Sequence, residues 1–272
     1  MAPNKVVNNI VWDALWEAYA EIQKEGWPLL QQHALHVYNC LVEIYVYPTN
    51  LVQVGISCLS FFVLMLSICF IVEVNNPNSG SPGRWKQIRN EIAESFPACV
   101  CSTSISLVHL KYAYPLRWGF KAPVFPSSFS LFLFECAYWM LCFEVSVYGL
   151  HRFLHWRKPI DMYRLIHRQH HLFFFPSAFA AQAIHPVEAM LFAETSLIAS
   201  VFLFPISVAT QYICGVLLLI WSILAHDSQF VLDQGMHFEH HSHQQTNFGF
   251  LGLFSLFFVG TYCECGINLN LP

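Results

Sequence analysis

Long apolar runs are the feature of this sequence that most limits what it can fold into. Leu51 to Val74 is almost wholly apolar, and further apolar runs span residues 129–150, 190–204 and 208–225. A helix of about 20 apolar residues is long enough to cross the ~30 Å hydrocarbon core of a bilayer. The chain is 56% hydrophobic and only 11% charged, whereas soluble domains carry about 25% charged residues. These features predict an integral membrane protein, and no basic run suggests a nucleic acid partner.

The order of the runs predicts an all-α fold with about four to five transmembrane helices. A weaker apolar run spans residues 96–114, and the last two runs are separated only by the segment FPIS, which is typical of a tight helical hairpin. No internal repeat or linker divides the chain. We therefore expect one membrane domain over residues 51–272, capped by a histidine-rich helical region.

Residues 1–50 have a different pattern, in which apolar and polar positions alternate. The apolar residues that recur there at helical spacing are Trp12, Leu15, Trp16 and Tyr19. This spacing predicts an amphipathic helix that lies at the membrane surface.

Histidine is concentrated in residues 151–243, which hold eleven of the fourteen histidines in three clusters, HRFLH, HRQHH and HFEHH. The clustered residues are His151, His155, His167, His170, His171, His237, His240 and His241. Helical spacings of three and four place side chains on one face, so each cluster can direct two or three imidazoles at a common point. Neutral imidazole binds first-row metals. Eight such ligands are too many for one ion and fit two ions side by side.

A structural role for these histidines is the alternative, because a lone histidine is usually a satisfied polar residue or a surface group. With a purely structural role, the three clusters would place many imidazole rings close together, each either positively charged or short of a hydrogen-bond partner. That arrangement is costly unless a metal holds the rings neutral. The metal interpretation is favoured.

The clusters also predict an orientation in the membrane. If they share one site, the end of the third apolar run and both ends of the hairpin lie on the same face. Eight of the thirteen basic residues then fall on that face: Arg84, Lys86, Arg89, Arg152, Arg157, Lys158, Arg164 and Arg168. Basic residues favour the cytosolic side, so the site is expected to face the cytosol.

Two ions held mostly by nitrogen, beside apolar helices, suggest redox chemistry on a lipid. Zinc hydrolases usually combine histidine with carboxylate ligands and keep an open site for water. A C–H bond in a lipid has no leaving group, and its attack requires an activated-oxygen species, which iron can generate from O2. The scarcity of acid and base side chains also favours chemistry carried by the metal.

Five segments carry a resemblance to a known family. In order they are EVSVYGLHRFLH, MYRLIHRQHH, PSAFAAQAIHPVEA, WSILAHDSQF and HFEHHSHQQTNFG, within a histidine-box core over residues 144–249. This core resembles the fatty acid hydroxylase/sterol desaturase superfamily, and its nearest branch is similar to the sterol C5-desaturases, or lathosterol oxidases. The resemblance implies a non-haem di-iron enzyme of the endoplasmic reticulum. Such an enzyme uses O2 and two electrons, delivered by cytochrome b5 and its NAD(P)H reductase, to desaturate or hydroxylate a lipid.

The resemblance also implies roles for individual residues. The eight clustered histidines carry over as ligands of two iron ions, and His226 in HDSQF becomes a ninth ligand. Zinc is the alternative metal in recombinant protein. His185 matches an H-P motif and is expected beside the ligands or in the substrate pocket. Gln182 replaces a family histidine near that pocket, and Met236 stands where the last cluster often begins with another histidine.

Three carboxylates are candidates to orient the ligands. Metal-bound imidazoles usually donate their second N–H to a carboxylate or carbonyl. Glu144 lies two helical turns before His151, while Asp227 and Glu239 adjoin proposed ligands. An ordinary solvated acidic residue is the alternative for each.

Two other classes of function compete with a di-iron oxidoreductase acting on a sterol, terpenoid or polyketide. A metal transporter would place ionisable residues along its apolar spans. Here the runs 51–74, 129–150 and 208–225 carry only Glu73, Glu135 and Glu144. The departures at Gln182 and Met236 leave a catalytically inactive family scaffold as the second alternative.

Overall fold

The computed structural model describes residues 16–32, 50–119, 122–173, 175–227, 236–244 and 246–249, and over these residues its regular structure is entirely helical. The elements are η1 (Ile22–Gly26), α3 (Leu51–Val74), α4 (Arg84–Val108), η2 (His109–Ala113), α5 (Tyr114–Trp118), α6 (Phe129–Leu154), α7 (Met162–Leu165), η3 (His167–Leu172), η4 (Ala178–Gln182), α8 (Pro186–Leu203), α9 (Val208–His226) and α10 (Met236–His243). The predicted all-α class is confirmed.

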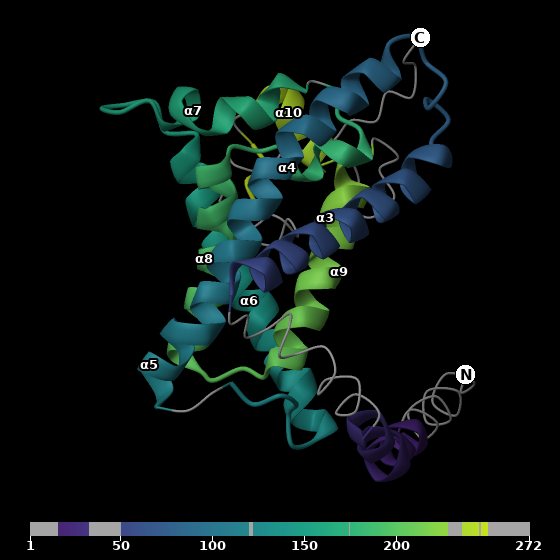
Figure 1. The fold of residues 1–272 in the computed structure, drawn as a ribbon, viewed down its shortest axis with the longest axis vertical. Helices are drawn as coiled ribbons and strands as arrows, with labels where there is room; N and C mark the ends of the chain where they lie inside the picture. Colours follow the sequence, from purple (N-terminus) through teal and green to yellow (C-terminus); the bar gives the residue numbers. More distant parts are fainter. Residues whose placement is uncertain are drawn as a thin grey trace, which may run out of the picture.

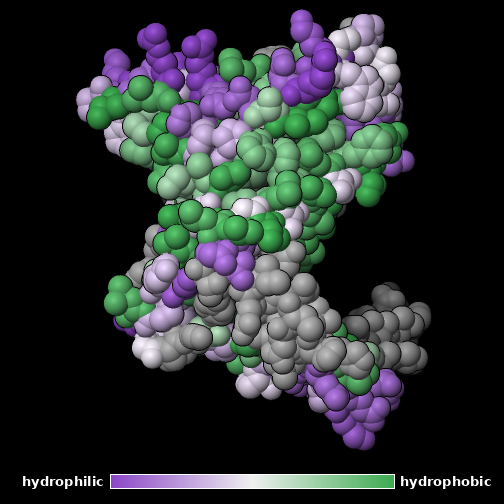
Figure 2. All heavy atoms as spheres, viewed as in Figure 1, coloured by the Kyte–Doolittle hydropathy of each residue, from purple (hydrophilic) through white to green (hydrophobic). Residues whose placement is uncertain are grey.

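Five long helices, α3, α4, α6, α8 and α9, form the body of the molecule, and the short helices α7 and α10 lie at one end of it (Figure 1). Among the described residues, α3, α6 and α9 are long and apolar enough to cross a membrane. The space-filling view shows apolar side chains around the middle of the body and hydrophilic ones at the end that carries α7 and α10 (Figure 2). The protein is an all-α integral membrane protein.

Polar side chains set where these three helices begin. Each cap residue has an extended backbone, and its side chain accepts a hydrogen bond from an amide three residues ahead. The pairs are Asn50 with Gln53, Ser128 with Leu131 and Ser207 with Thr210. Helix α8 ends at Leu203 and α9 begins after the Ser207 cap, so the predicted break between two helices at FPIS is confirmed.

The N-terminal segment is described only in part, because Trp12 and Leu15 lie outside the described residues. Residues 16–32 are helical. Trp27 is buried there, and its ring lies 5.6 Å from that of Phe129 and 5.3 Å from that of Phe132. This segment therefore packs on the first turns of α6.

The helices pack around the short element η4, close to the end where the histidines gather. Its residues Ala178, Phe179 and Ala181 share one buried cluster with side chains of α3, α4 and α9. Alanine allows the surrounding helices to approach η4 closely, because it adds only a methyl group to the packing. Thus η4 is wedged between helices that are distant in sequence.

A buried ion pair holds the loop that precedes η4. The guanidinium of Arg84 donates to both carboxylate oxygens of Glu73, at 2.7 and 3.0 Å. Its Nη1 also donates to the carbonyl oxygens of Phe175 and Pro176 at 3.4 Å. The loop ends at Ser177, whose amide and hydroxyl donate to the Glu91 carboxylate. The start of α4 thereby fixes the chain that follows the second histidine cluster.

Candidate metal centre

Nine imidazoles from α6 and its C-cap, η3, α9 and α10 converge at one end of the helical body, and they form two groups. The first group contains His151, His155, His167, His171 and His240, and the second contains His170, His226, His237 and His241. Within each group, one nitrogen from every ring lies within 4.8 Å of those from the other rings. The eight clustered histidines and His226, all singled out from the sequence, are brought together here.

The two groups divide each pair of adjacent histidines. His170 belongs to the second group and His171 to the first, while His240 belongs to the first and His241 to the second. The predicted convergence is confirmed at a spacing of four, because His167 shares a group with His171 and His237 shares one with His241. It was wrong at a spacing of three, because His170 and His240 join the opposite group from the histidine that begins their cluster. Successive residues point about 100° apart on an α-helix and about 120° apart on a 3₁₀-helix. Neighbours on α10 and on η3 therefore reach different groups.

The imidazole nitrogens in each group approach one another closely. The Nε2–Nε2 distances are 3.0 Å for His151–His167 and His167–His171, 3.1 Å for His155–His240 and 2.9 Å for His226–His237. Two nitrogens that lie ~2.1 Å from one metal at a right angle are about 3.0 Å apart. The spacing therefore fits atoms that share an ion.

Hydrogen bonds to backbone carbonyls show which nitrogens carry lone pairs. The Nδ1 atoms of His151, His226 and His240 lie 3.0, 2.6 and 2.6 Å from the carbonyl oxygens of Phe248, Ser222 and Thr246. A carbonyl only accepts, so each Nδ1 carries the proton and each Nε2 presents a lone pair to the group. Lone pairs about 3 Å apart repel unless a cation lies between them. This donor set fits metal ions.

Glu188 was not singled out from the sequence, yet its carboxylate contacts a histidine of the first group. Nδ1 of His167 donates to Oε1 of Glu188 over 2.6 Å, and each side chain is 1% exposed. The bond leaves Nε2 of His167 to face the group. The feature of the sequence that could have indicated Glu188 is the segment HPVE, in which this carboxylate follows His185 by three residues.

Burial keeps the imidazoles neutral. The pKa falls to about 2 for His155 and to about 3 for His171, first because burial removes water and then because neighbouring imidazoles oppose a second positive charge. The same causes hold the pKa well below 6.5 for His167, His170, His237, His240 and His241. Neutral imidazole is the form that binds metal.

The three carboxylates chosen from the sequence lie in different settings. Glu144 is fully buried on α6. Asp227 is buried at the C-cap of α9, and its backbone carbonyl accepts from Nδ2 of Asn76 over 2.5 Å. Glu239 instead bonds Nδ1 of His243 over 2.6 Å, and that ring, 64% exposed, belongs to neither group.

Gln182 and His185, both expected near the substrate pocket, have different positions in the structure. Gln182 lines a cavity beside the histidines. His185 is not among the residues that line it, and its Nδ1 accepts from the amide of Val187 over 3.2 Å. Since α8 begins at Pro186, His185 acts as the N-cap of that helix.

The cavity that Gln182 lines has a volume of about 510 Å³. Five histidines line it: His151, His167, His170, His226 and His237. Its remaining walls come mostly from apolar side chains of α3, α4, α6, α8 and α9. An apolar molecule in this cavity would therefore contact the histidine end directly.

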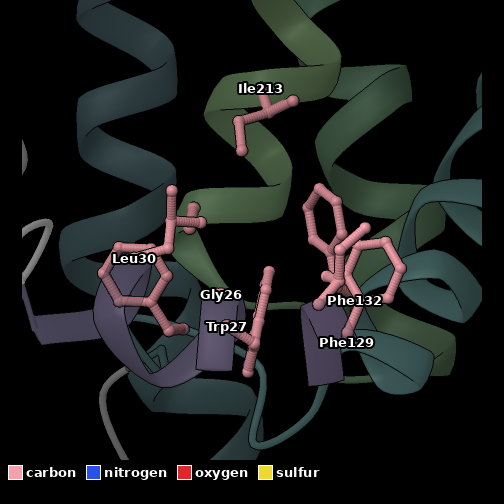
Figure 3. A pocket seen from close by; sticks show the side chains of 9 residues that line it. Gly26, Trp27, Leu30, Phe129, Phe132 and Ile213 are labelled. Carbon is pink, nitrogen blue, oxygen red and sulfur yellow. The ribbon is translucent and has the colours of Figure 1, made fainter. Parts of the chain in front are cut away.

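A second cavity, of about 370 Å³, lies at the opposite ends of α6 and α9. Figure 3 shows Trp27 and Leu30 of the N-terminal segment together with Phe129 and Phe132 of α6 around it. No histidine is among its described lining residues. The larger cavity is therefore the candidate substrate site.

Comparisons with known proteins agree with these motifs. Residues 136–261 match the family model described as fatty acid hydroxylase. The chain is 28% identical to human lathosterol oxidase in an alignment 213 residues long, which covers 72% of this chain and 68% of that protein. It is 27% identical to the Delta(7)-sterol 5(6)-desaturase of Eremothecium gossypii in an alignment 123 residues long, which covers 42% of this chain and 33% of that one. No solved structure matches the chain.

The Delta(7)-sterol 5(6)-desaturase of Saccharomyces cerevisiae is 28% identical in an alignment 112 residues long, which covers 39% of this chain and 30% of the relative. The matched segments thus span about a third of each fungal relative. All nine histidines of the two groups fall inside the matched range. The predicted resemblance to the fatty acid hydroxylase/sterol desaturase superfamily, and to its sterol C5-desaturase branch, is confirmed as sequence similarity over this segment.

Proposed function

We propose that this protein is a di-iron, O2-dependent oxidoreductase that desaturates or hydroxylates a hydrophobic, lipid-like substrate. The observation that carries the proposal is the pair of histidine groups that faces a mostly apolar cavity. The relatives named as desaturases and oxidases of sterols support the same class of reaction. A sterol, a terpenoid or a polyketide-like metabolite is the expected kind of substrate.

The nine histidines would hold two iron ions, five around one and four around the other. When bound, the iron pair supplies the activation of O2 and the oxidation of an unactivated C–H bond. Desaturation removes two hydrogens from the substrate and yields two waters from O2, two external electrons and two protons. Hydroxylation places one oxygen atom in the substrate and yields one water. Cytochrome b5 and an NAD(P)H reductase are the electron donors that the family resemblance implies.

The residues of the chain itself position and protect this chemistry. Glu188 holds the Nδ1 proton of His167, and the carbonyls of Ser222, Thr246 and Phe248 hold three others, so each Nε2 stays free to bind metal. The apolar walls of the cavity exclude water and bind the substrate by burial of its surface. We expect the enzyme in the endoplasmic reticulum membrane, with the metal centre on the cytosolic face.

The buried carboxylates of the apolar helices argue against a transport pathway. Glu73 is paired with Arg84. Glu135 accepts hydrogen bonds from the hydroxyls of Ser207 and Thr210 at 2.7 and 2.6 Å, at the cap of α9. These contacts give both carboxylates structural roles. The complete set of nine histidines likewise argues against an inactive scaffold.

The test is expression in a host that retains its own reductase, with metal analysis of the purified protein and mass analysis of lipid extracts. We expect about two iron ions per chain, and a lipid that loses two hydrogens or gains one oxygen. The His170→Ala variant should abolish the product. His243→Ala is the matched control, because this exposed ring lies on α10 but outside both groups. A product that persists in His170→Ala would refute the proposed ligand role.

A further inference from the structure

The larger cavity reaches the molecular surface beside two of the apolar helices. Most of the described residues that line this cavity are buried or half-buried. Only four of them are exposed, and they are Ser60 and Leu64 of α3 and Tyr212 and Val216 of α9. Leu64 and Tyr212 are each 44% exposed, and Val216 is 38% exposed. Within the described part of its wall, the cavity therefore opens between α3 and α9.

The residues that border this opening lie at matching levels on the two helices. On each helix they are four residues apart, which places them on one face, one turn from each other. Both helices rise toward the histidine end (Figure 1), where Nδ2 of Asn76, just after α3, donates to the carbonyl oxygen of Asp227, just after α9, over 2.5 Å. Leu64 lies ten residues before the end of α3, and Val216 lies ten residues before the end of α9. Each is therefore about 15 Å from the end of its helix, at a rise of ~1.5 Å per residue.

Between this level and the histidine end, the two helices are packed together. Met65 and Cys69 of α3 share one buried cluster with Leu219 and Ile223 of α9. Because α3 crosses α9 obliquely (Figure 1), the helices diverge on the side of this contact that is remote from the histidines. The opening lies where they begin to diverge.

Gly215 leaves a gap in the wall at the level of the opening. It lies between Tyr212 and Val216 in the sequence of α9, and it lines the cavity. A Cβ atom at this position would have no atom within 4 Å beyond its chain neighbours and the backbone of its own helix. Open space therefore adjoins the backbone of α9 at this point.

The surroundings of the opening are apolar. Helices α3 and α9 are two of the three described helices that are long and apolar enough to cross a membrane. A point about 15 Å from the end of such a helix lies near the middle of a hydrocarbon core ~30 Å thick. None of the four exposed residues at the opening carries a charged side chain. The opening therefore faces lipid chains rather than water.

We propose that the substrate enters the cavity sideways, from the hydrocarbon core of the bilayer, through the opening between α3 and α9. The inference rests on the proposed function, because it takes this cavity as the substrate site. A molecule on this route must dissolve in hydrocarbon, and a charged group is costly there. The class of substrate that fits is an uncharged, largely apolar lipid. The competing route is entry from the aqueous phase at the histidine end.

The test follows the entry of a photoreactive hydrocarbon, octadecane with a diazirine at mid-chain, into the full chain in lipid nanodiscs. Light flashes at increasing times after addition, followed by mass analysis of peptides, show which residues the probe has reached. We expect labelling of Phe143 and Phe192, which line the cavity. Leu133 and Leu141 should also be labelled, because they are exposed on α6 and do not line the cavity.

Larger side chains at the opening should delay the probe. Gly215→Leu should slow the labelling of Phe143 and Phe192 by about tenfold, because the leucine side chain must move aside at each entry. The labelling of Leu133 and Leu141 should not change. Leucine favours a helix more than glycine does, so this variant should keep its fold. Ser60→Phe narrows the same opening from α3 and gives a second, independent variant.

Gly55→Leu is the matched control. Gly55 also lies on α3, is exposed and has open space at its Cβ position, but it does not line the cavity. The proposal would be overturned if Phe143 and Phe192 stayed unlabelled in the wild type or kept the wild-type rate in both opening variants. An equal delay in Gly55→Leu would also overturn it. Labelling requires neither iron nor turnover, so absence of metal or of an oxidised product would refute the proposed function and leave the measured route intact.

Discussion

Nδ1 of His167 donates to Oε1 of Glu188 over 2.6 Å, and this buried bond turns Nε2 of His167 toward two other imidazoles of the first group. His167 lies on η3 and Glu188 on α8. The bond therefore couples the geometry of the candidate metal centre to the packing of a long helix.

Loss of this carboxylate should weaken metal binding. Partners of this kind typically contribute 10–100-fold in metal affinity. We therefore expect the Glu188→Gln variant to lose its metal at a chelator concentration roughly 10–100-fold lower than the wild type requires. Glu194→Gln is the matched control, since Glu194 lies on the same helix and pairs with His109, outside both groups, at 3.3 Å. Chelator titrations with metal analysis measure the effect. Equal metal retention in the two variants would contradict the assignment.

The division of adjacent histidines predicts different effects for neighbouring substitutions. His240→Ala removes one of five donors from the first group, whereas His241→Ala removes one of four from the second. A group left with three donors should lose its ion more readily than one left with four. We expect about one metal ion per chain in His241→Ala and nearly two in His240→Ala, measured by elemental analysis after dialysis. The same metal content in both variants would show that the two groups do not act separately.

The metal-free protein should lose stability as the pH falls. Burial holds the pKa of His155 at about 2 and that of His171 at about 3 in the folded protein. The unfolded chain, with ordinary values near 6.5, therefore binds more protons than the folded chain below that pH. Stability is fully present above about pH 6.5 and declines as the pH falls toward the folded values. Unfolding temperatures measured from about pH 7.5 to about pH 5 would reveal this decline.

Replacement of both residues tests the cause of that decline. A His155→Ala/His171→Ala double variant removes two of the groups that must stay neutral, so its pH profile should be shallower than that of the wild type. A wild-type profile that is flat over the whole interval would rule out buried neutral histidines as the source.

The buried pair of Arg84 and Glu73 should be sensitive to the loss of one partner. Removal of one member of such a pair typically costs about 3–5 kcal/mol, because the other charge stays buried without compensation. Glu73→Gln should therefore lower the unfolding temperature strongly. The double variant Glu73→Leu/Arg84→Met should recover part of the loss. A double variant as unstable as the sum of the single variants would show that the pair itself contributes little.

Much of the fold was predictable because its signals are local. The apolar runs predicted α3, α6 and α9, since length and composition alone decide whether a helix can cross a bilayer. The FPIS segment predicted the hairpin, because proline and a serine cap act within a few residues. The identities of the eight clustered imidazoles followed from motif spacing in the same way, whereas His226 followed only from the family resemblance.

Other features of the site were not predictable from local pattern. His185 resembles a site residue in sequence, yet in the structure it caps α8. Glu188 gave only the weak signal of a carboxylate in HPVE, and its contact with His167 depends on where α8 packs.

The sequence by itself determined that this chain crosses a membrane with helices and carries its clustered histidines in a segment similar to the fatty acid hydroxylase model. Only the tertiary structure decided which histidine joins which group, which carboxylate orients His167, and which side chains line the cavity beside the histidines. The physical reason is that hydrophobic length and ligand chemistry belong to short segments. The pairing of donor atoms depends on contacts such as that of His155 with His240, which lie 85 residues apart.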